Sequence, residues 1–171
     1  MRIYLTGFMG CGKTYWGKIW AEENNFLFYD IDELIEQAEG TTIETIFDKK
    51  GESYFRKMES ALLRTTLDLD NCIISCGGGT PCYDDNMDWM NNHGITIYLE
   101  SSVKELLNNM LGEPHKRPLI KNIDQSELLN YVEKKLSERI PFYKKASITE
   151  TVNSLNKNSL DKLINHHQTF Q

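Results

Sequence analysis

The first residues that could do chemistry stand near the N-terminus, in a loop rich in glycine. The segment Gly7-Phe8-Met9-Gly10-Cys11-Gly12-Lys13-Thr14 matches the G-x-x-x-x-G-K-[ST] pattern of phosphate-binding loops. Glycines permit positive φ angles, so consecutive backbone N–H groups can turn toward phosphate oxygens. The lysine of the pattern reaches the β- and γ-phosphates, and the hydroxyl after it ligates Mg²⁺. The segment predicts Mg²⁺ on Thr14 and a nucleoside triphosphate on Gly10, Cys11, Gly12, Lys13, Thr14 and Tyr15.

The segments on either side of this loop agree with that interpretation. A short apolar run precedes it and predicts a strand over 2–6. Trp16, Ile19 and Trp20 recur at helical spacing after it and predict a helix over 12–23. The unpaired N–H groups and the positive end of the helix dipole would then face the phosphates. A glycine-rich turn with an incidental lysine is the alternative, and the strand–loop–helix context disfavours it.

The rest of the chain alternates short apolar runs with amphipathic segments. This alternation is typical of βαβ units, in which a parallel sheet is covered by helices on both faces. We therefore expect a three-layer α/β/α fold with a five-stranded parallel sheet, built as one domain over 1–171. Further strands are expected at 26–32, with Asp30 and Asp32 at the carboxyl end, and at 72–75, 95–99 and 148–152. A helix is expected to follow Asp32 and to end at Gly40, and others are expected at 41–47, 52–67, 83–92, 103–111, 124–145 and 159–168.

Local signals mark the ends of some of these helices. Thr41 with Glu44 and Ser102 with Glu105 have the spacing of capping boxes, in which each side chain bonds to the backbone of the other residue. Gly51 is expected to break the helical pattern, and Pro141 to interrupt the helix over 124–145.

Polar residues end or follow two of the expected strands. Asp30 and Asp32 come directly after the run 26–29, and Gly77, Gly78 and Gly79 follow the run 72–75. In parallel sheets, ligands bind at the carboxyl ends of the strands, so these residues are candidates for a second substrate site. By themselves, the two acids could be turn or helix-capping residues, and the glycines could form only a tight turn.

Three arginines complete the set of candidates. Arg56 is expected on a helix, where Glu52 or Glu59 could instead pair with it, and Arg139 has Glu133 and Glu138 nearby. Arg117 lies in the segment 112–123, which lacks helical periodicity and contains two prolines. A loop of this length without secondary structure is typical of a mobile lid.

Taken together, these motifs resemble those of the shikimate kinase family. The resemblance covers the chain from Tyr4 to about Val152, and five separate motifs occur in the right order at the right spacing. It implies a P-loop kinase fold related to nucleoside monophosphate kinases. It also implies transfer of the γ-phosphate of ATP to the 3-hydroxyl of shikimate in aromatic amino acid biosynthesis, with Mg²⁺ as cofactor.

The resemblance also assigns roles to individual residues. Asp32, Lys13 and Arg117 correspond to the catalytic residues, with Asp32 taking the proton of the reacting hydroxyl and the lid residue Arg117 closing over the phosphate. Arg56 and Arg139 correspond to the pair that holds the shikimate carboxylate, and Gly77, Gly78 and Gly79 to the floor of that site. Asp30 corresponds to an acid that acts on Mg²⁺ through water. The helices over about 31–67 correspond to the shikimate-binding part.

The sequence departs from the family pattern near the nucleotide. Tyr15 stands where the family usually has a small hydroxyl residue. Met110 stands seven residues before Arg117, where an arginine commonly packs on adenine, so a cation–π contact is lost. The segment 153–159 matches the other side of the adenine site poorly, and Lys157 is our candidate for an ATP contact there.

Composition limits the remaining choices. The chain has 171 residues, is 40% hydrophobic and 26% charged, and carries a net charge of −6. An acidic chain without a basic stripe is not expected to bind nucleic acid, and no apolar run is long enough to span a membrane. We expect the first residues to lead straight into a strand, with no leader, and the four cysteines lack metal-type spacing. We expect a cytoplasmic protein with reduced thiols that works as a monomer.

Two other functions stay open from the sequence alone. The first is a different small-molecule P-loop kinase, of the gluconate kinase type, which would keep the phosphate loop and change the acceptor contacts. The second is a protein that binds a nucleotide or a metabolite without catalysis. Lys13, Thr14, Asp32 and Arg117 are all present, which favours an active enzyme.

Overall fold

A parallel sheet forms the centre of the molecule. The computed structural model describes residues 1–112 and 125–169 of the chain. Its five strands lie in the order β2-β3-β1-β4-β5, and all four neighbouring pairs are parallel. The strands are β1 (Arg2–Thr6), β2 (Leu27–Asp30), β3 (Cys72–Ser75), β4 (Ile95–Glu100) and β5 (Ile148–Thr151).

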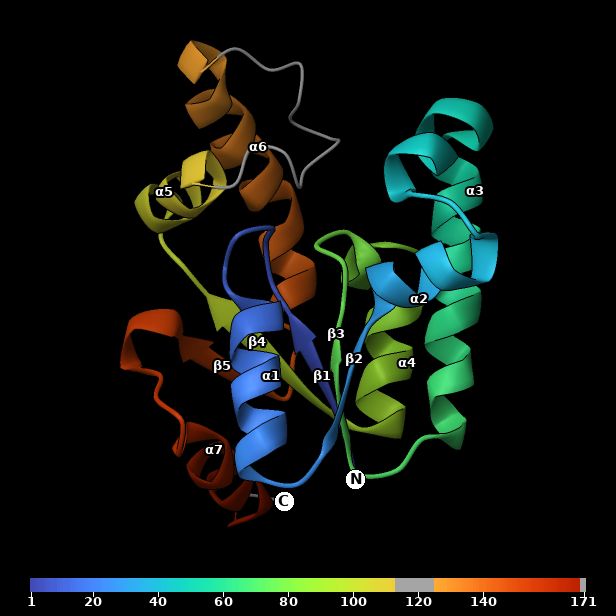
Figure 1. Cartoon of the computed structure of the whole chain (residues 1–171). Helices are drawn as coiled ribbons and strands as arrows, with labels where there is room; N and C mark the ends of the chain where they lie inside the picture. Colours follow the sequence, from blue (N-terminus) through green and yellow to red (C-terminus); the bar gives the residue numbers. More distant parts are fainter. Residues whose placement is uncertain (113–124, 170–171) are drawn as a thin grey trace.

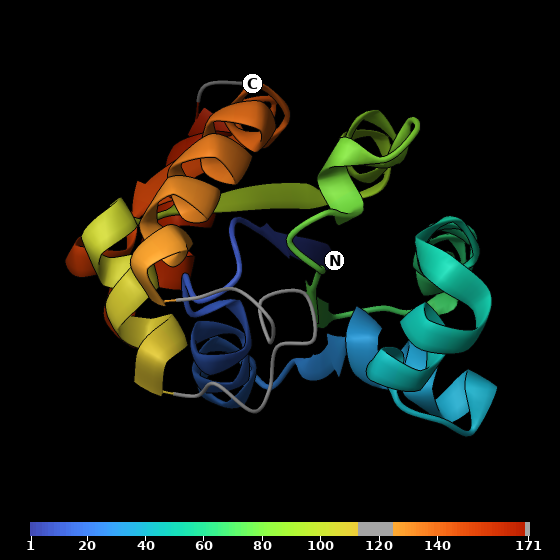
Figure 2. The same cartoon turned by 90° about the horizontal axis from the view of Figure 1, so that it is seen from above.

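Helices cover both faces of this sheet (Figures 1 and 2). Successive residues of β1 show the two layers: Ile3 and Leu5 pack in one hydrophobic cluster with Trp20, whereas Tyr4 packs in another with Leu63 and Met90. Alternation of this kind follows from the two-residue period of a strand. The helices are α1 (Lys13–Glu23), α2 (Ile31–Glu39), α3 (Ile43–Thr65), α4 (Asn86–His93), α5 (Val103–Gly112), α6 (Gln125–Tyr143) and α7 (Ser159–Thr169).

The predicted three-layer fold with five parallel strands is confirmed, and so are several local signals. Gly40 ends α2 with φ 63°, a left-handed conformation that glycine adopts without strain. Ser102 and Glu105 form the expected reciprocal capping box, with Ser102 N–H donating to the Glu105 carboxylate at 2.8 Å. Gly51 interrupts α3 with φ 79° and ψ 169°, so the predicted break is present inside one long element.

Other details differ from the prediction. The helix that follows Gly40 is capped by Thr42, whose Oγ1 accepts the N–H of Thr45 at 3.3 Å, and not by Thr41. Asp32 lies in the first turn of α2 rather than at the end of β2, because the Asp30 side chain accepts the Asp32 N–H at 3.0 Å and starts the helix there. Helix α6 runs on through Pro141 to Tyr143.

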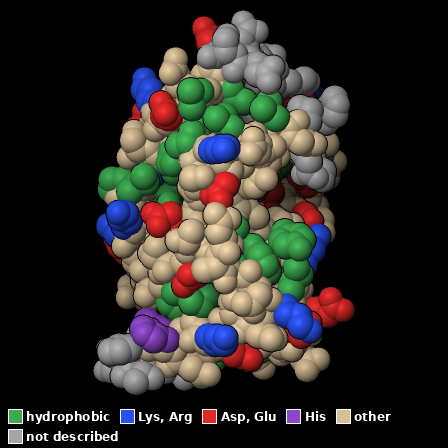
Figure 3. Space-filling view, turned by 90° about the vertical axis from the view of Figure 1, so that its left-hand side faces the viewer, with side chains coloured by type: hydrophobic (Ala, Val, Ile, Leu, Met, Phe, Trp, Pro, Cys, Tyr) green, Lys and Arg blue, Asp and Glu red, His purple; other side chains and the backbone are tan. Residues whose placement is uncertain are grey.

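The surface carries no sign of a membrane-spanning part in the described ranges. No helix there is both long enough and apolar enough to cross a bilayer. Figure 3 shows the side of the molecule that lies on the left in Figure 1, where hydrophobic side chains occur in several groups with charged side chains among them. The predicted lid, except for Gly112 at the end of α5, lies outside the described residues.

Candidate active site

A cleft opens at the carboxyl ends of the central strands. It has a volume of about 460 Å³, and basic and acidic side chains converge in it together with the phosphate loop and the first glycines of the 77–79 segment. A second hollow of about 450 Å³ adjoins it between the same loop and α5. A larger hollow of about 580 Å³ lies between β5 and α7, away from every predicted site residue. Because polar groups that fix a ligand mark a binding site better than size does, the first cleft is the candidate.

The phosphate loop is held in shape mainly by its own backbone. Gly10 and Gly12 adopt φ angles of 85° and 90°, which residues with a side chain rarely adopt. The Lys13 ammonium donates to the carbonyl oxygens of Gly7 at 2.9 Å and Phe8 at 3.0 Å. It is thereby fixed at the base of the loop with only 8% of the residue exposed, and it lines the cleft.

Three oxygen-bearing side chains meet beside this loop. The Thr14 hydroxyl donates to the Asp30 carboxylate at 2.9 Å and lies 3.4 Å from the Ser75 hydroxyl. Asp30 and Ser75 are register partners at the ends of β2 and β3, which explains their proximity. Hydroxyl and carboxylate oxygens are the ligands that Mg²⁺ prefers, with phosphate and water completing its shell. The donor set therefore fits Mg²⁺ bound together with a nucleotide.

Asp32 faces the same cleft with an altered acidity. Burial and the neighbouring carboxylates of Asp30 and Glu59 raise its pKa to about 7, against smaller opposing effects of Lys13 and Arg56. These neighbours crowd the carboxyl group, but the residue as a whole is exposed at the cleft, so solvent screens part of this effect. A carboxyl group with a pKa near the working pH is suited to accept a proton.

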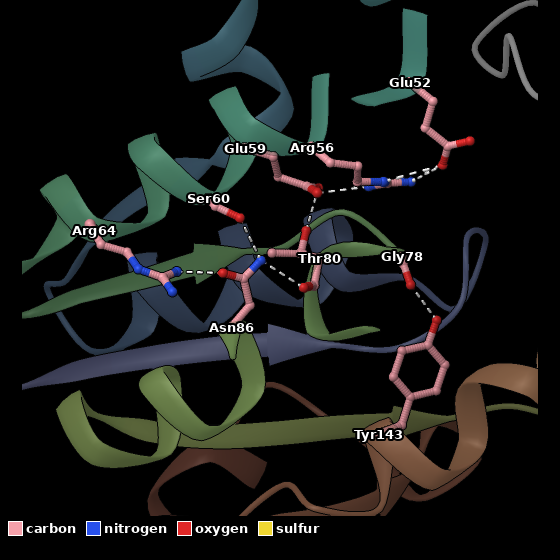
Figure 4. A network of polar contacts seen from close by, with 9 residues as sticks. All are labelled: Glu52, Arg56, Glu59, Ser60, Arg64, Gly78, Thr80, Asn86 and Tyr143. Carbon is pink, nitrogen blue, oxygen red and sulfur yellow. Dashed lines mark hydrogen bonds and ion pairs between the residues drawn. The ribbon is translucent and has the colours of Figure 1, made fainter. Parts of the chain in front are cut away.

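Arg56 is a buried arginine held by two acids of its own helix. Its guanidinium donates to Glu59 at 2.7 Å and to Glu52 at 3.3 Å (Figure 4). Glu59 is fully buried, and its second carboxylate oxygen accepts the hydroxyl of Thr80. Both acidic partners considered from the sequence are thus present, and they orient the guanidinium instead of leaving it on the surface.

The glycine loop lies between Arg56 and Arg139. A Cβ atom on Gly79 would come within 2.5 Å of the Arg56 guanidinium, and one on Gly78 within 3.3 Å of that of Arg139. A side chain at Gly79 is therefore incompatible with the position of Arg56. Tyr143 lies one helical turn after Arg139, and its hydroxyl donates to the Gly78 carbonyl at 2.5 Å (Figure 4). The hydrogen bond from Tyr143 thus ties the glycine loop to α6, and both arginines border the loop.

Arg139 differs from Arg56 in its partners. Its guanidinium lies 5.3 Å from the centre of the Phe8 ring, a cation–π contact with the phosphate loop that follows β1. In the described part of the chain, no carboxylate lies within ion-pair distance of it, neither Glu133 nor Glu138 included. Its charge is therefore available to an anionic ligand bound at the glycine loop.

The structure adds detail to the other predicted nucleotide contacts. The Cys11 side chain is buried, so only its backbone can face a ligand, while Tyr15 is exposed at the rim. Lys157 forms an ion pair at 3.3 Å with Glu23, at the end of α1 opposite to the phosphate loop, and its ATP contact remains a prediction. Arg117 lies outside the described residues.

The interpretation of Met110 needs correction. Its side chain is 1% exposed and belongs to the hydrophobic core, so it does not face a nucleotide. Its neighbours Asn108 and Asn109 line the hollow beside the phosphate loop instead, and the Asn109 amide donates to the Gly10 carbonyl at 2.8 Å. A helix exposes successive residues on different faces, so the neighbours of a buried position face outward.

Four residues that shape the site were not predicted from the sequence. Ser75 could have been found as a polar residue at the end of a buried strand. The others act through contacts between distant segments and left no local signal. The four residues are Ser75, Thr80, Asn109 and Tyr143.

Comparisons with known proteins point to one family. A family model described as shikimate kinase matches residues 9–168. A curated shikimate kinase from Bacteroides fragilis is 35% identical over 98% of both chains. A shikimate kinase structure from Bacteroides thetaiotaomicron matches 100% of this chain and 96% of its own, with 33% identity and a TM-score of 0.86.

Two further structures bear on the acceptor. A shikimate kinase from Acinetobacter baumannii, solved in complex with shikimate, matches 99% of this chain and 94% of its own, with 30% identity and a TM-score of 0.87. A gluconokinase from Sinorhizobium meliloti covers 97% of this chain and 88% of its own at 15% identity, with a TM-score of 0.53. The second likeness shows a shared fold only.

Proposed function

The chain belongs to the shikimate kinase family, and we propose that it transfers the γ-phosphoryl group of ATP to the 3-hydroxyl of shikimate. The products are shikimate 3-phosphate and ADP. The observation that carries this proposal is the cleft itself. It joins a phosphate loop with Lys13 to a glycine loop bordered by two arginines, and Asp32 lies between them.

The phosphate side of the cleft binds and polarises the nucleotide. The loop N–H groups and the start of α1 hold the phosphates, and Lys13 contributes a fixed positive charge at the β- and γ-phosphates. Thr14 would hold Mg²⁺ directly, and Asp30 would act on it through water. When bound, this ion neutralises charge on the phosphate oxygens.

The acceptor side places shikimate. Arg56 and Arg139 pair with its carboxylate, since the planar guanidinium group matches a carboxylate in a bidentate way. The backbone of Gly77, Gly78 and Gly79 forms the floor against which the ring lies. The arginines thereby set which hydroxyl of the ring reaches Asp32.

Asp32 orients the 3-hydroxyl and receives its proton as the new P–O bond forms. Transfer of a phosphoryl group depends mainly on positioning and on stabilisation of charge, so this proton moves late. Arg117 of the predicted lid adds positive charge over the transferring group. An arginine in this role is worth about 10³–10⁵ in rate in related systems.

The alternative acceptor is gluconate. An acyclic sugar acid needs contacts along an extended chain, whereas this cleft offers a glycine loop bordered by two arginines. The low identity to the gluconokinase structure gives no separate support to that alternative.

The test is ADP release from MgATP by the purified protein with shikimate, with gluconate and without acceptor. We expect strong stimulation by shikimate alone. Stimulation by gluconate alone would contradict the acceptor assignment, and ATP binding without stimulation by either would favour a non-catalytic binding protein. The monomeric state and cytoplasmic location expected from the sequence stay predictions, which size-exclusion chromatography and cell fractionation test.

A further inference from the structure

One buried amide stands behind the acceptor side of the cleft without lining it. Asn86 is the first residue of α4 and is fully buried. Its Nδ2 donates to the Thr80 carbonyl at 2.9 Å and to the Ser60 hydroxyl at 3.0 Å, and its Oδ1 accepts from the Arg64 guanidinium (Figure 4). Because each of its polar atoms has a partner, this amide permits only one arrangement of the segments around it.

Asn86 is linked to the substrate arginine through Thr80. Thr80 directly follows the glycine loop and is fully buried. Its hydroxyl donates to Glu59, whose other oxygen accepts from Arg56 at 2.7 Å (Figure 4). The bond from Asn86 to the Thr80 carbonyl fixes the backbone at the end of the glycine loop, and the bond from Arg56 to Glu59 fixes the direction of the guanidinium.

We propose that Asn86 and Thr80 are positioning residues for the acceptor substrate. Together they hold the glycine loop against α3 and aim Arg56 at the place where a carboxylate binds. The inference rests on the function proposed above, and it concerns two residues that touch neither substrate. A shift of about 1 Å in such a supporting contact is enough to weaken a bidentate interaction.

The competing partner of Arg56 explains why this support matters. The second acid that pairs with Arg56 is Glu52, whose side chain is 63% exposed. This ion pair is weak because water screens it, so it does not fix the guanidinium in one position. Glu59 holds the guanidinium on the buried side only as long as its own carboxylate is fixed. The Thr80 hydroxyl is the group that fixes it, and Asn86 fixes Thr80.

The first variant is Asn86→Asp. It keeps the shape of the side chain and the oxygen that pairs with Arg64, but it replaces the donor to the Ser60 hydroxyl and the Thr80 carbonyl with an acceptor. The hydroxyl can turn and donate to the new oxygen, whereas the carbonyl is left without a donor. We expect the KM for shikimate to rise about 5- to 30-fold, the effect of one disrupted buried hydrogen bond. The KM for ATP is expected to change by less than about two-fold, because the phosphate side has its own supports.

Ser60→Ala is the matched control. It removes the other partner of the same amide nitrogen and leaves the link to Thr80 intact. We expect the KM for shikimate to stay within about two-fold of the wild type. An equal rise in both variants would show that a general loosening of α3 against α4 is responsible, and it would overturn the proposal.

A second pair of variants tests the other link and remains informative if Asn86→Asp does not fold. Thr80→Val removes the hydroxyl that donates to Glu59, whereas Thr80→Ser keeps it. We expect Thr80→Val to raise the KM for shikimate and Thr80→Ser to restore it, with the KM for ATP constant in both.

Unchanged shikimate KM values in Thr80→Val and in folded Asn86→Asp would overturn the inference while leaving the proposed function in place. Failure of the wild type to use shikimate would instead contradict the function itself. The two failures are therefore distinguishable in the same set of assays.

Discussion

The two sides of the cleft are held in place by different means. On the phosphate side, Lys13 contacts the carbonyls of Gly7 and Phe8, so the supports lie within a few residues of one another. On the acceptor side, Arg56 depends on Glu59 and Thr80, and Gly78 depends on Tyr143. One side is a local backbone structure, and the other is a network of side chains from three helices and a loop.

This difference has a consequence for function. A local loop keeps its shape whenever β1 and α1 form, so substitutions on that side should alter chemistry with little change in fold. A side-chain network couples binding to stability, because each residue that meets the substrate also satisfies a buried neighbour. The predictions below test this contrast.

The largest effect is expected for Asp32→Asn. Loss of the proton acceptor should lower kcat about 10²–10⁴-fold, the usual contribution of general base catalysis. In the wild type, kcat/KM for shikimate should rise with pH up to about 7, because Asp32 must be ionised to act and its pKa lies there. The variant should not show this rise of kcat/KM with pH. Turnover near the wild-type level would refute the role of Asp32.

Lys13→Ala tests the phosphate side. Removal of a fixed positive charge at the transferring group should lower kcat about 10²–10³-fold. Since the bonds of Lys13 to described residues all go to carbonyl oxygens and a thiol of its own loop, the melting temperature should change little. Lys162→Ala, an exposed lysine on α7, serves as the control for loss of charge. A large fall in melting temperature for Lys13→Ala would contradict the contrast between the two sides.

Arg56→Ala and Arg139→Ala test the acceptor side as a pair. Both should raise the KM for shikimate, by about 10- to 100-fold for loss of a charged hydrogen-bonding partner. Only Arg56→Ala leaves a buried carboxylate, that of Glu59, without its cation, which costs about 3–5 kcal/mol. Thermal unfolding should separate them, with a fall of about 6–20 °C for Arg56→Ala alone. Equal melting temperatures would mean that Glu59 does not need Arg56.

The smallest effect expected is on the way in which the stability of the protein depends on pH through Asp32. Its folded pKa of about 7 lies above the ordinary value of 3.8, so the folded protein favours the protonated form. The wild type should therefore lose stability as pH rises from 4 to 7, and Asp32→Asn should not show this loss. We expect equal melting temperatures near pH 4 and a variant more stable by about 2–4 °C at pH 8, a value reduced by solvent screening. A less stable variant at pH 8 would contradict the raised pKa.

Much of the fold could be predicted because its signals are local. The G-x-x-x-x-G-K-[ST] pattern, the buried strands and Gly40 each act through their own backbone conformation or a two-residue period. Lys13, Thr14 and Asp30 line the same cleft for a different reason, because the carboxyl ends of parallel strands meet at one edge of the sheet. Element ends were less certain, as the Thr42 cap and the helical position of Asp32 show, because neighbouring residues compete for the same cap.

The sequence by itself determined the phosphate loop, the order of the elements and the residue types that can bind a phosphate and a carboxylate. Only the tertiary structure decided how those residues are aimed. It buried Met110 and turned Asn109 to the loop, paired Arg56 with Glu59, and left Arg139 without a carboxylate among the described residues. Such contacts join segments far apart in the chain. Their geometry follows from the packing of helices against the sheet, which no local pattern encodes.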